Sequence, residues 1–164
     1  MSDIDAMAKT FGKMADALSD KDLAKIVKKA AGPLKAAVVS AAPEKTGQLK
    51  GGIVLHKERS RVSGKAVYDI MMDGKKNDIF QKPIKNRVRS QKSYAYYPAS
   101  QEYGFFSRRP DGGMTYTRPT GEKMKIDKVP GKHFMRTGVE VAGKTAENEI
   151  LGNTLKAIED EFGG

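Results

Sequence analysis

The sequence contains no cysteine and no tryptophan, and aromatic residues make up only 7% of it. Without cysteine, the chain can form no disulfide, hold no metal ion through a thiolate and use no cysteine nucleophile. Hydrophobic residues account for 38%, below the usual apolar share of a globular chain, so we expect a thin core and much surface committed to partners. A length of 164 residues suits one domain, and we predict that residues 1–164 form a single domain.

Long apolar runs are also missing from the sequence. No stretch approaches the roughly 18 uncharged apolar residues of a membrane span, so we expect no contact with a membrane. The N-terminus carries acidic residues early and lacks the apolar run of a signal peptide, so we expect a soluble, unprocessed chain. A sequence without cysteine also fits assembly in a reducing cytoplasm.

Side chains that could support catalysis are few. The two histidines, His56 and His133, do not have the spacing of metal ligands on one helix, and no phosphate-loop, dinucleotide or Gly-x-Ser-x-Gly pattern occurs. Asp69 and Asp73 recur at a short spacing, but Asp73 precedes Gly74 and fits a turn. We therefore predict that the chain is not an enzyme and that it has no catalytic residue, metal site or cofactor.

Positive charge is concentrated in the middle of the chain, whose net charge is +10. Residues 50–136 carry 20 Lys or Arg against 8 Asp or Glu, whereas residues 137–164 carry 2 against 6. A basic middle suggests contact with a polyanion or with an acidic protein surface. A solvated basic surface that only aids solubility explains the composition equally well.

Apolar spacing predicts helices at both ends of the chain. Residues 1–42 should form two of them, the second starting at Ser19 and ending before Pro43, with a kink or a short break at Pro33. A third helix should occupy roughly residues 139–162. Its apolar stripe, from which most of its acidic residues are excluded, consists of Leu151, Leu155, Ile158 and Phe162.

The middle of the chain, residues 43–136, has the pattern of strands and long basic loops. Residues 53–56 and 65–72 should pair as a hairpin, and residues 114–117 and 123–126 as an exposed ribbon. Segregated helices and strands predict the α+β class. We expect a small, mostly antiparallel sheet packed by the two N-terminal helices and by one long C-terminal helix within residues 137–164.

The segment from Gly74 to Lys92 is strongly basic and contains a single acid, Asp78. It could lie along phosphates, because such contacts need only charge and reach, although no recognisable nucleic-acid module surrounds it. We favour the alternative that it is a loop that becomes ordered on an acidic neighbouring subunit. The candidate contact residues are Lys75, Lys76, Lys82, Lys85, Arg87, Arg89 and Lys92.

Three short segments have turn and cap chemistry. In residues 42–53, Pro43 stops the helix, Thr46 can close a turn, Gly47 permits a positive φ and Leu49 should enter the core. In residues 94–104, which begin with Tyr94 and Ala95, a proline-initiated short helix should end at Tyr103 and Gly104. In residues 129–136, Pro130 makes a turn and Phe134 should anchor the last helix in the core.

Glu102 stands apart within the second of these segments. It is an acid inside an otherwise aromatic and basic block. We therefore predict that it pairs with an arginine of a neighbouring subunit.

In their order and spacing, residues 42–53, 94–104 and 129–136 resemble a family of siphophage neck proteins. Its members are described as tail-completion, head–tail joining or minor tail components of the "gene product ten" type. The family pattern is a helix ending in Ala-Pro, then Thr-Gly-x-Leu, a Tyr-Ala…Glu-Tyr/Phe-Gly block and a Pro…Phe turn that opens a final helix. The matching positions are Pro43, Thr46, Gly47, Leu49, Tyr94, Ala95, Tyr103, Gly104, Pro130 and Phe134.

The resemblance implies a structural virion protein in the neck or tail of a tailed phage, assembled in the host cytoplasm. Copies would form a homo-oligomeric ring, expected to be a hexamer, that joins the head connector to the tail terminator or tail-tube proteins. DNA would pass through the lumen without sequence specificity. The alternative from the residues is a basic nucleic-acid-binding protein that uses residues 74–92, with a DNA affinity that falls steeply with salt.

Overall fold

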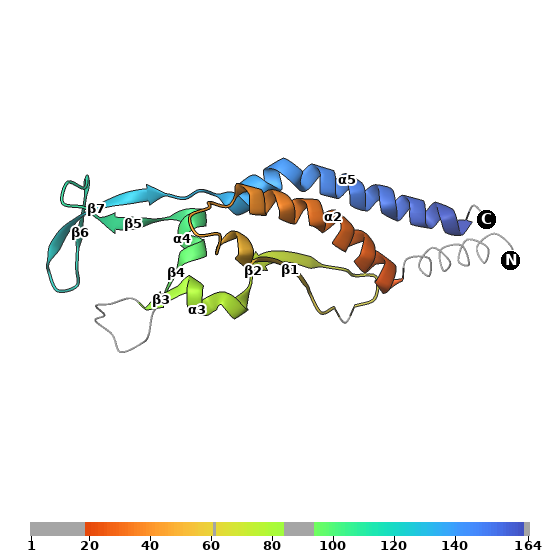
Figure 1. The fold of residues 1–164 in the computed structure, drawn as a ribbon, viewed down its shortest axis with the longest axis horizontal. Coiled ribbons are helices and arrows are strands. Elements are labelled where there is room, and N and C mark those ends of the chain that lie inside the picture. The colour runs from red at the N-terminus through yellow and green to blue at the C-terminus, as the bar shows by residue number, and fades with distance from the viewer. Residues whose placement is uncertain (1–18, 61, 84–93, 163–164) are drawn as a thin grey trace, which may run out of the picture.

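Two long helices run side by side along one half of the molecule in the computed structural model, which describes residues 19–60, 62–83 and 94–162. They are α2 (Asp20–Ala41) and α5 (Phe134–Phe162), and a three-stranded sheet extends from the opposite end (Figure 1). The predicted α+β class and the long C-terminal helix are confirmed. The first of the two predicted N-terminal helices lies outside the described residues.

Helix α2 begins and ends where the sequence predicts. The Ser19 hydroxyl accepts a hydrogen bond from the Asp22 N–H at 3.3 Å, which caps the first turn. Lys25 donates to the Asp22 carboxylate at 2.8 Å, and this hydrogen bond lowers the pKa of Asp22. The helix ends at Ala41 because Ala42, which precedes a proline, takes an extended backbone with φ −66° and ψ 134°.

Helix α2 runs through Pro33 without interruption, so the predicted alternative of a short break there is wrong. A proline removes one helical N–H, which leaves the carbonyl of Lys29 without its usual partner. Lys29 and Pro33 both lie on the exposed side of the helix, where water can hydrogen-bond to that carbonyl. The buried side of α2 therefore stays regular.

Small side chains let α5 pack closely on α2. The buried residues of α5 recur every four positions after Phe134: Gly138, Ala142 and Ala146. A Cβ atom added at Gly138 would stand 2.6 Å from the Cα atom of Val38, which is far inside contact distance. Further along the pair, Lys29 and Glu149 approach to 3.9 Å, so the two helices are antiparallel.

Helix α5 begins at Phe134, earlier than the predicted start near residue 139. Two residues of its predicted apolar stripe, Leu151 and Leu155, are exposed and lie on the side away from the buried alanines. Ile158 is half-buried, and the side chain of Phe162 lies outside the described part of the chain. The face that packs on α2 is therefore made of smaller residues than the sequence suggested.

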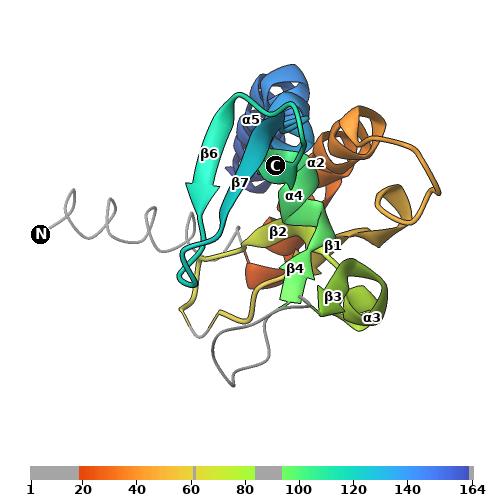
Figure 2. The same ribbon diagram turned by 90° about the vertical axis from the view of Figure 1, so that its left-hand side faces the viewer.

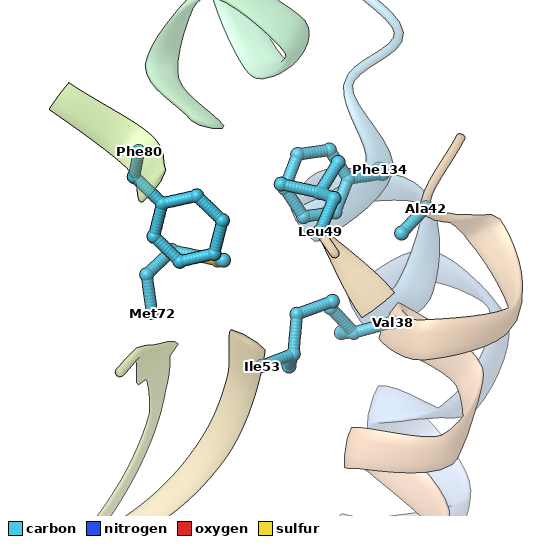
Figure 3. Packing of buried hydrophobic residues seen from close by; sticks show 7 residues of the cluster. All are labelled: Val38, Ala42, Leu49, Ile53, Met72, Phe80 and Phe134. Carbon is cyan, nitrogen blue, oxygen red and sulfur yellow. The ribbon is translucent and has the colours of Figure 1, made fainter. Parts of the chain in front are cut away.

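A small apolar core joins the helix pair to the first hairpin (Figure 3). Phe80 is fully buried, and its ring meets that of Tyr96 edge-on with the centroids 6.3 Å apart. Partial burial raises the pKa of Tyr96. The predictions that Leu49 and Phe134 enter the core are confirmed, and the core consists of Val38, Ala42, Leu49, Ile53, Met72, Phe80 and Phe134.

The described strands form three separate antiparallel sheets rather than one. The predicted hairpin is β1 (Ile53–Lys57) with β2 (Tyr68–Met72), and Ile53 pairs with Met72. The second sheet pairs β3 (Gln81–Pro83) with β4 (Tyr94–Tyr96). The third, here called the arm, has the order β5-β7-β6 and consists of β5 (Gly104–Arg108), β6 (Met114–Thr117) and β7 (Lys123–Pro130).

Short helices connect these strands. They are η1 (Lys50–Gly52), η2 (Gly74–Lys76), α3 (Asn77–Phe80) and α4 (Tyr97–Tyr103). The predicted positive φ of Gly47 is observed at 71°, and Gly104 ends α4 with φ 82°. Asp73 is a turn residue, as predicted, since its carboxylate accepts from the Lys75 N–H at 3.0 Å.

The segment predicted as a basic loop over residues 74–92 is partly regular structure, which corrects that prediction. Its first part forms η2, α3 and β3, because Phe80 anchors it in the core. Its second part, residues 84–93, lies outside the described residues. No helix in the described ranges is long and apolar enough to cross a membrane.

Two glycines of α5 test the close packing on α2. Gly138→Ala should destabilise the fold by about 1–3 kcal/mol, because the added methyl group collides with Val38. Gly152→Ala is the matched control, because nothing lies within 4 Å of its added Cβ and alanine favours a helix by about 1 kcal/mol over glycine. Urea unfolding should show opposite shifts of the midpoint, and equal shifts would contradict the packing.

Candidate assembly surfaces

The carboxylate of Glu102 caps the N-terminus of α5. Glu102 is only 7% exposed, and its two oxygens accept from the N–H groups of Met135 at 2.9 Å and Arg136 at 3.4 Å. Amides of a first helical turn have no partner inside the helix, and the positive end of the helix dipole favours a negative charge. The side chain therefore ties α4 to α5 within one chain.

The main chain also holds together the point where α4 meets the start of α5, here called the Glu102 junction. The Glu102 carbonyl accepts from the His133 N–H at 3.2 Å, and a Cβ atom added at Gly131 would collide with that carbonyl. The arm starts here, because β5 begins at Gly104 and β7 ends at Pro130. The position of the arm relative to the helix pair is therefore set at this junction.

The pairing of Glu102 with an arginine of a neighbouring subunit stays a prediction. The structure gives both carboxylate oxygens partners within the same chain. A partner's guanidinium would have to share a carboxylate that is almost fully buried.

The predicted basic contact residues are only partly within the described chain. Lys75 lies in η2 and Lys82 in β3, and both are exposed. The Lys76 ammonium donates to the Gly51 carbonyl at 2.8 Å, so it supports the turn before β1. The remaining four lie outside the described residues: Lys85, Arg87, Arg89 and Lys92.

The residues of the family pattern are spread over the junctions of the fold. Leu49 and Phe134 are buried in the core, whereas Thr46, Tyr94, Ala95 and Tyr103 are exposed. The others stand at the ends of elements, with Pro43 just after α2, Gly47 before η1, Gly104 between α4 and β5, and Pro130 at the end of β7.

The arm carries apolar side chains on one face. Its register pairs Met114 with Ile126 and Tyr116 with Met124, and Phe106 lies on the same side through its pairing with Lys128. We call this set the apolar face of the arm: Phe106, Met114, Tyr116, Met124 and Ile126. Three of its members are about half exposed or more, namely Phe106 at 59%, Met114 at 49% and Tyr116 at 48%.

The opposite face of the arm is largely polar. Thr115 and Thr117 of β6 pair there with Lys125 and Lys123 of β7. An antiparallel sheet with apolar side chains on one face and polar side chains on the other normally packs its apolar face against a core. Phe106, Met114 and Tyr116 stay about half exposed or more, so the described residues leave much of the apolar face uncovered.

A second set of exposed apolar residues lies along α5. We call it the outer face of α5, and it consists of Val141, Leu151 and Leu155, which are 72%, 55% and 59% exposed. Lys144 and Asn148 lie between them by helical spacing. Three exposed acids border this face: Glu140, Glu147 and Glu159.

The chemistry of these surfaces is that of binding. Within the residues that the structure describes, no group of three or more His, Asp or Glu side chains is placed to hold a metal ion. Exposed apolar patches with polar borders mark sites of protein–protein contact. The two surfaces are therefore the candidate functional sites of this chain.

A protein-family model described as "Bacteriophage HK97-gp10, putative tail-component" matches residues 5–104. The match covers more than half of the chain, which therefore belongs to this family of bacteriophage tail components and is a virion protein. Two of the three segments that carry the resemblance, residues 42–53 and 94–104, lie inside the match, and residues 129–136 lie beyond it. Neither the curated proteins nor the solved structures contain a match to this chain.

The sequence pattern predicted two of the three strands of the arm. The ribbon of β6 with β7 was expected, but β5 was missed because Phe105 and Phe106 are adjacent and hide the alternation of a strand. The signal that points to an apolar face is the period of two shared by Met114 with Tyr116 and by Met124 with Ile126.

Removing the acceptor at Glu102 should loosen the junction. Glu102→Ala leaves two helical N–H groups without a partner and should lower the free energy of unfolding by about 1–3 kcal/mol, with Glu102→Gln costing less. Glu147→Gln is the control, since Glu147 is exposed and should change stability by no more than about 0.5 kcal/mol. Chemical denaturation measures all three, and unchanged stability in Glu102→Ala would reject the capping role.

Proposed function

We propose that this chain is a structural subunit of the phage neck, where copies form a ring that joins the head connector to the tail. The family match makes the chain a phage tail component. The observation that supports a ring in the neck is the arm, which projects from the body (Figure 1) and whose apolar face is exposed. Such a face is costly in water and is suited to burial in an interface.

A closed ring is the assembly that fits a neck. Each copy in a cyclic ring presents one surface to the copy before it and a different surface to the copy after it. The arm and the outer face of α5 are two such unlike surfaces on one chain. By resemblance, six is the expected number of copies, and the neighbours above and below the ring are the head connector and the tail-terminator or tail-tube proteins.

The positive charge of the chain suits a ring through which DNA passes. The net charge is +10, and cations that touch phosphates need no particular base sequence. Exposed cations on the polar face of the arm, Lys123 and Lys125, illustrate the type of contact. A virion protein with this role assembles in the host cytoplasm and takes part in no reaction.

Deleting the gene from a phage that encodes it should leave heads and tails separate. Without the joining subunit, electron microscopy of lysates should find DNA-filled heads and finished tails that are not attached to each other. Supplying the chain in trans should restore joined particles, with the protein located at the neck by antibody labelling. Joined, infectious particles in the complete absence of the chain would contradict the proposed function.

A further inference from the structure

We propose that the apolar face of the arm of one copy docks on the outer face of α5 of the next copy. This contact rests on the proposed function, because it is the interface through which the ring would close. Both surfaces belong to described residues of the same chain.

The apolar face of the arm has the geometry of a surface that is normally covered. Side chains at alternate positions of β6 and β7 point to one side, and Met114, Tyr116 and Phe106 remain about half exposed or more. Polar threonines and lysines occupy the other side of the same strands. An amphipathic sheet of this kind needs an apolar partner on one side only.

The outer face of α5 offers an apolar partner of matching character. Val141, Leu151 and Leu155 are each more than half exposed, although they are large aliphatic side chains. Leu151 and Leu155 fall on the side of the helix opposite Ala142 and Ala146, which pack on α2, and Val141 flanks that side. A sheet face laid on this side would bury both sets.

The charges that border the two surfaces are complementary. Three exposed acids border the outer face of α5, namely Glu140, Glu147 and Glu159. Arg108 and Lys128 lie on the same side of the arm as its apolar residues, by their pairing with Ile126 and Phe106. Complementary charge at the border of an interface favours the right partner and speeds encounter.

Position excludes this contact within a single chain. The arm projects from one end of the long axis, and the outer face of α5 extends towards the other end (Figure 1). Viewed from the arm end, β6 and β7 stand in front of α5 (Figure 2). Two unlike surfaces at opposite ends make a head-to-tail contact, which repeats from copy to copy and closes into a ring if the rotation allows.

Residues 1–18 are the competing occupant of the outer face of α5. Their sequence has the apolar spacing of a helix, and they precede α2, which begins at the end of the molecule where α5 finishes (Figure 1). They carry two lysines against three aspartates, so they do not complement the acidic helix α5. The basic arm does, which favours a second copy.

Cysteine cross-linking in assembled particles tests the contact. Because the chain has no cysteine, the double variant Tyr116→Cys with Leu151→Cys introduces the only two thiols, both at exposed positions. Phage that lacks its own copy is complemented with the variant, and purified particles are treated with a short bismaleimide and run on a denaturing gel. We expect a ladder of two, three and more linked copies, because each copy would bond to two neighbours.

Thr115→Cys with Leu151→Cys is the matched control, because Thr115 lies on β6 one residue away but on the polar face. It should give at least about tenfold less linked product than the double variant with Tyr116→Cys. Each single variant should give no ladder, since arm thiols would meet helices rather than other arms.

The possible failures are distinguishable. Dimers from Tyr116→Cys alone would mean that arms dock on arms, which overturns the arm-to-helix contact. Particles that contain the chain but yield no ladder, with Leu151→Cys protected or linked elsewhere, would also overturn it while leaving the ring in place. Particles that never contain the chain would overturn the proposed function and this contact with it.

Discussion

The contact between Gly138 of α5 and Val38 of α2 leaves no space for a side chain, and the arrangement of the fold depends on it. Ala142 and Ala146 continue this contact along α5, so the two helices are held together by the close approach of their backbones rather than by large side chains. A core of this kind buries little apolar surface for a chain of 164 residues. Larger apolar residues, such as Leu151, Phe106 and Tyr116, remain on the surface as a consequence.

The Glu102 junction attaches the arm to this helix pair. Its carboxylate holds the first turn of α5, and the chain enters and leaves the arm at Gly104 and Pro130, next to the same site. An arm fixed at its base presents its apolar face in a constant direction, which is what a repeating contact between identical copies requires. The buried charge therefore has a structural role that is linked to assembly through the arm.

Local chemistry predicted much of this fold. The Ser19 cap, the end of α2 before Pro43, the positive φ of Gly47 and the burial of Phe134 follow from single residues and their neighbours. The features that the sequence did not predict all depend on tertiary packing. Phe80 draws part of a basic segment into the core, and α5 turns its alanines rather than its leucines towards α2, because packing decides which face is buried. The period of two in β6 and β7 indicates the apolar face of the arm, but the place of Phe106 on that face could not be predicted, since it depends on the pairing of β5 with β7.

The apolar surfaces left exposed by a thin core should be covered by other copies in a neck ring. Static light scattering tests this most directly, on the purified full chain and on mixtures with the connector and tail-tube proteins of the same phage. The mixtures should contain a complex whose mass includes several copies of this chain. A mass of one copy under every condition, together with binding to duplex DNA at low salt, would rule out the ring and favour a nucleic-acid-binding protein.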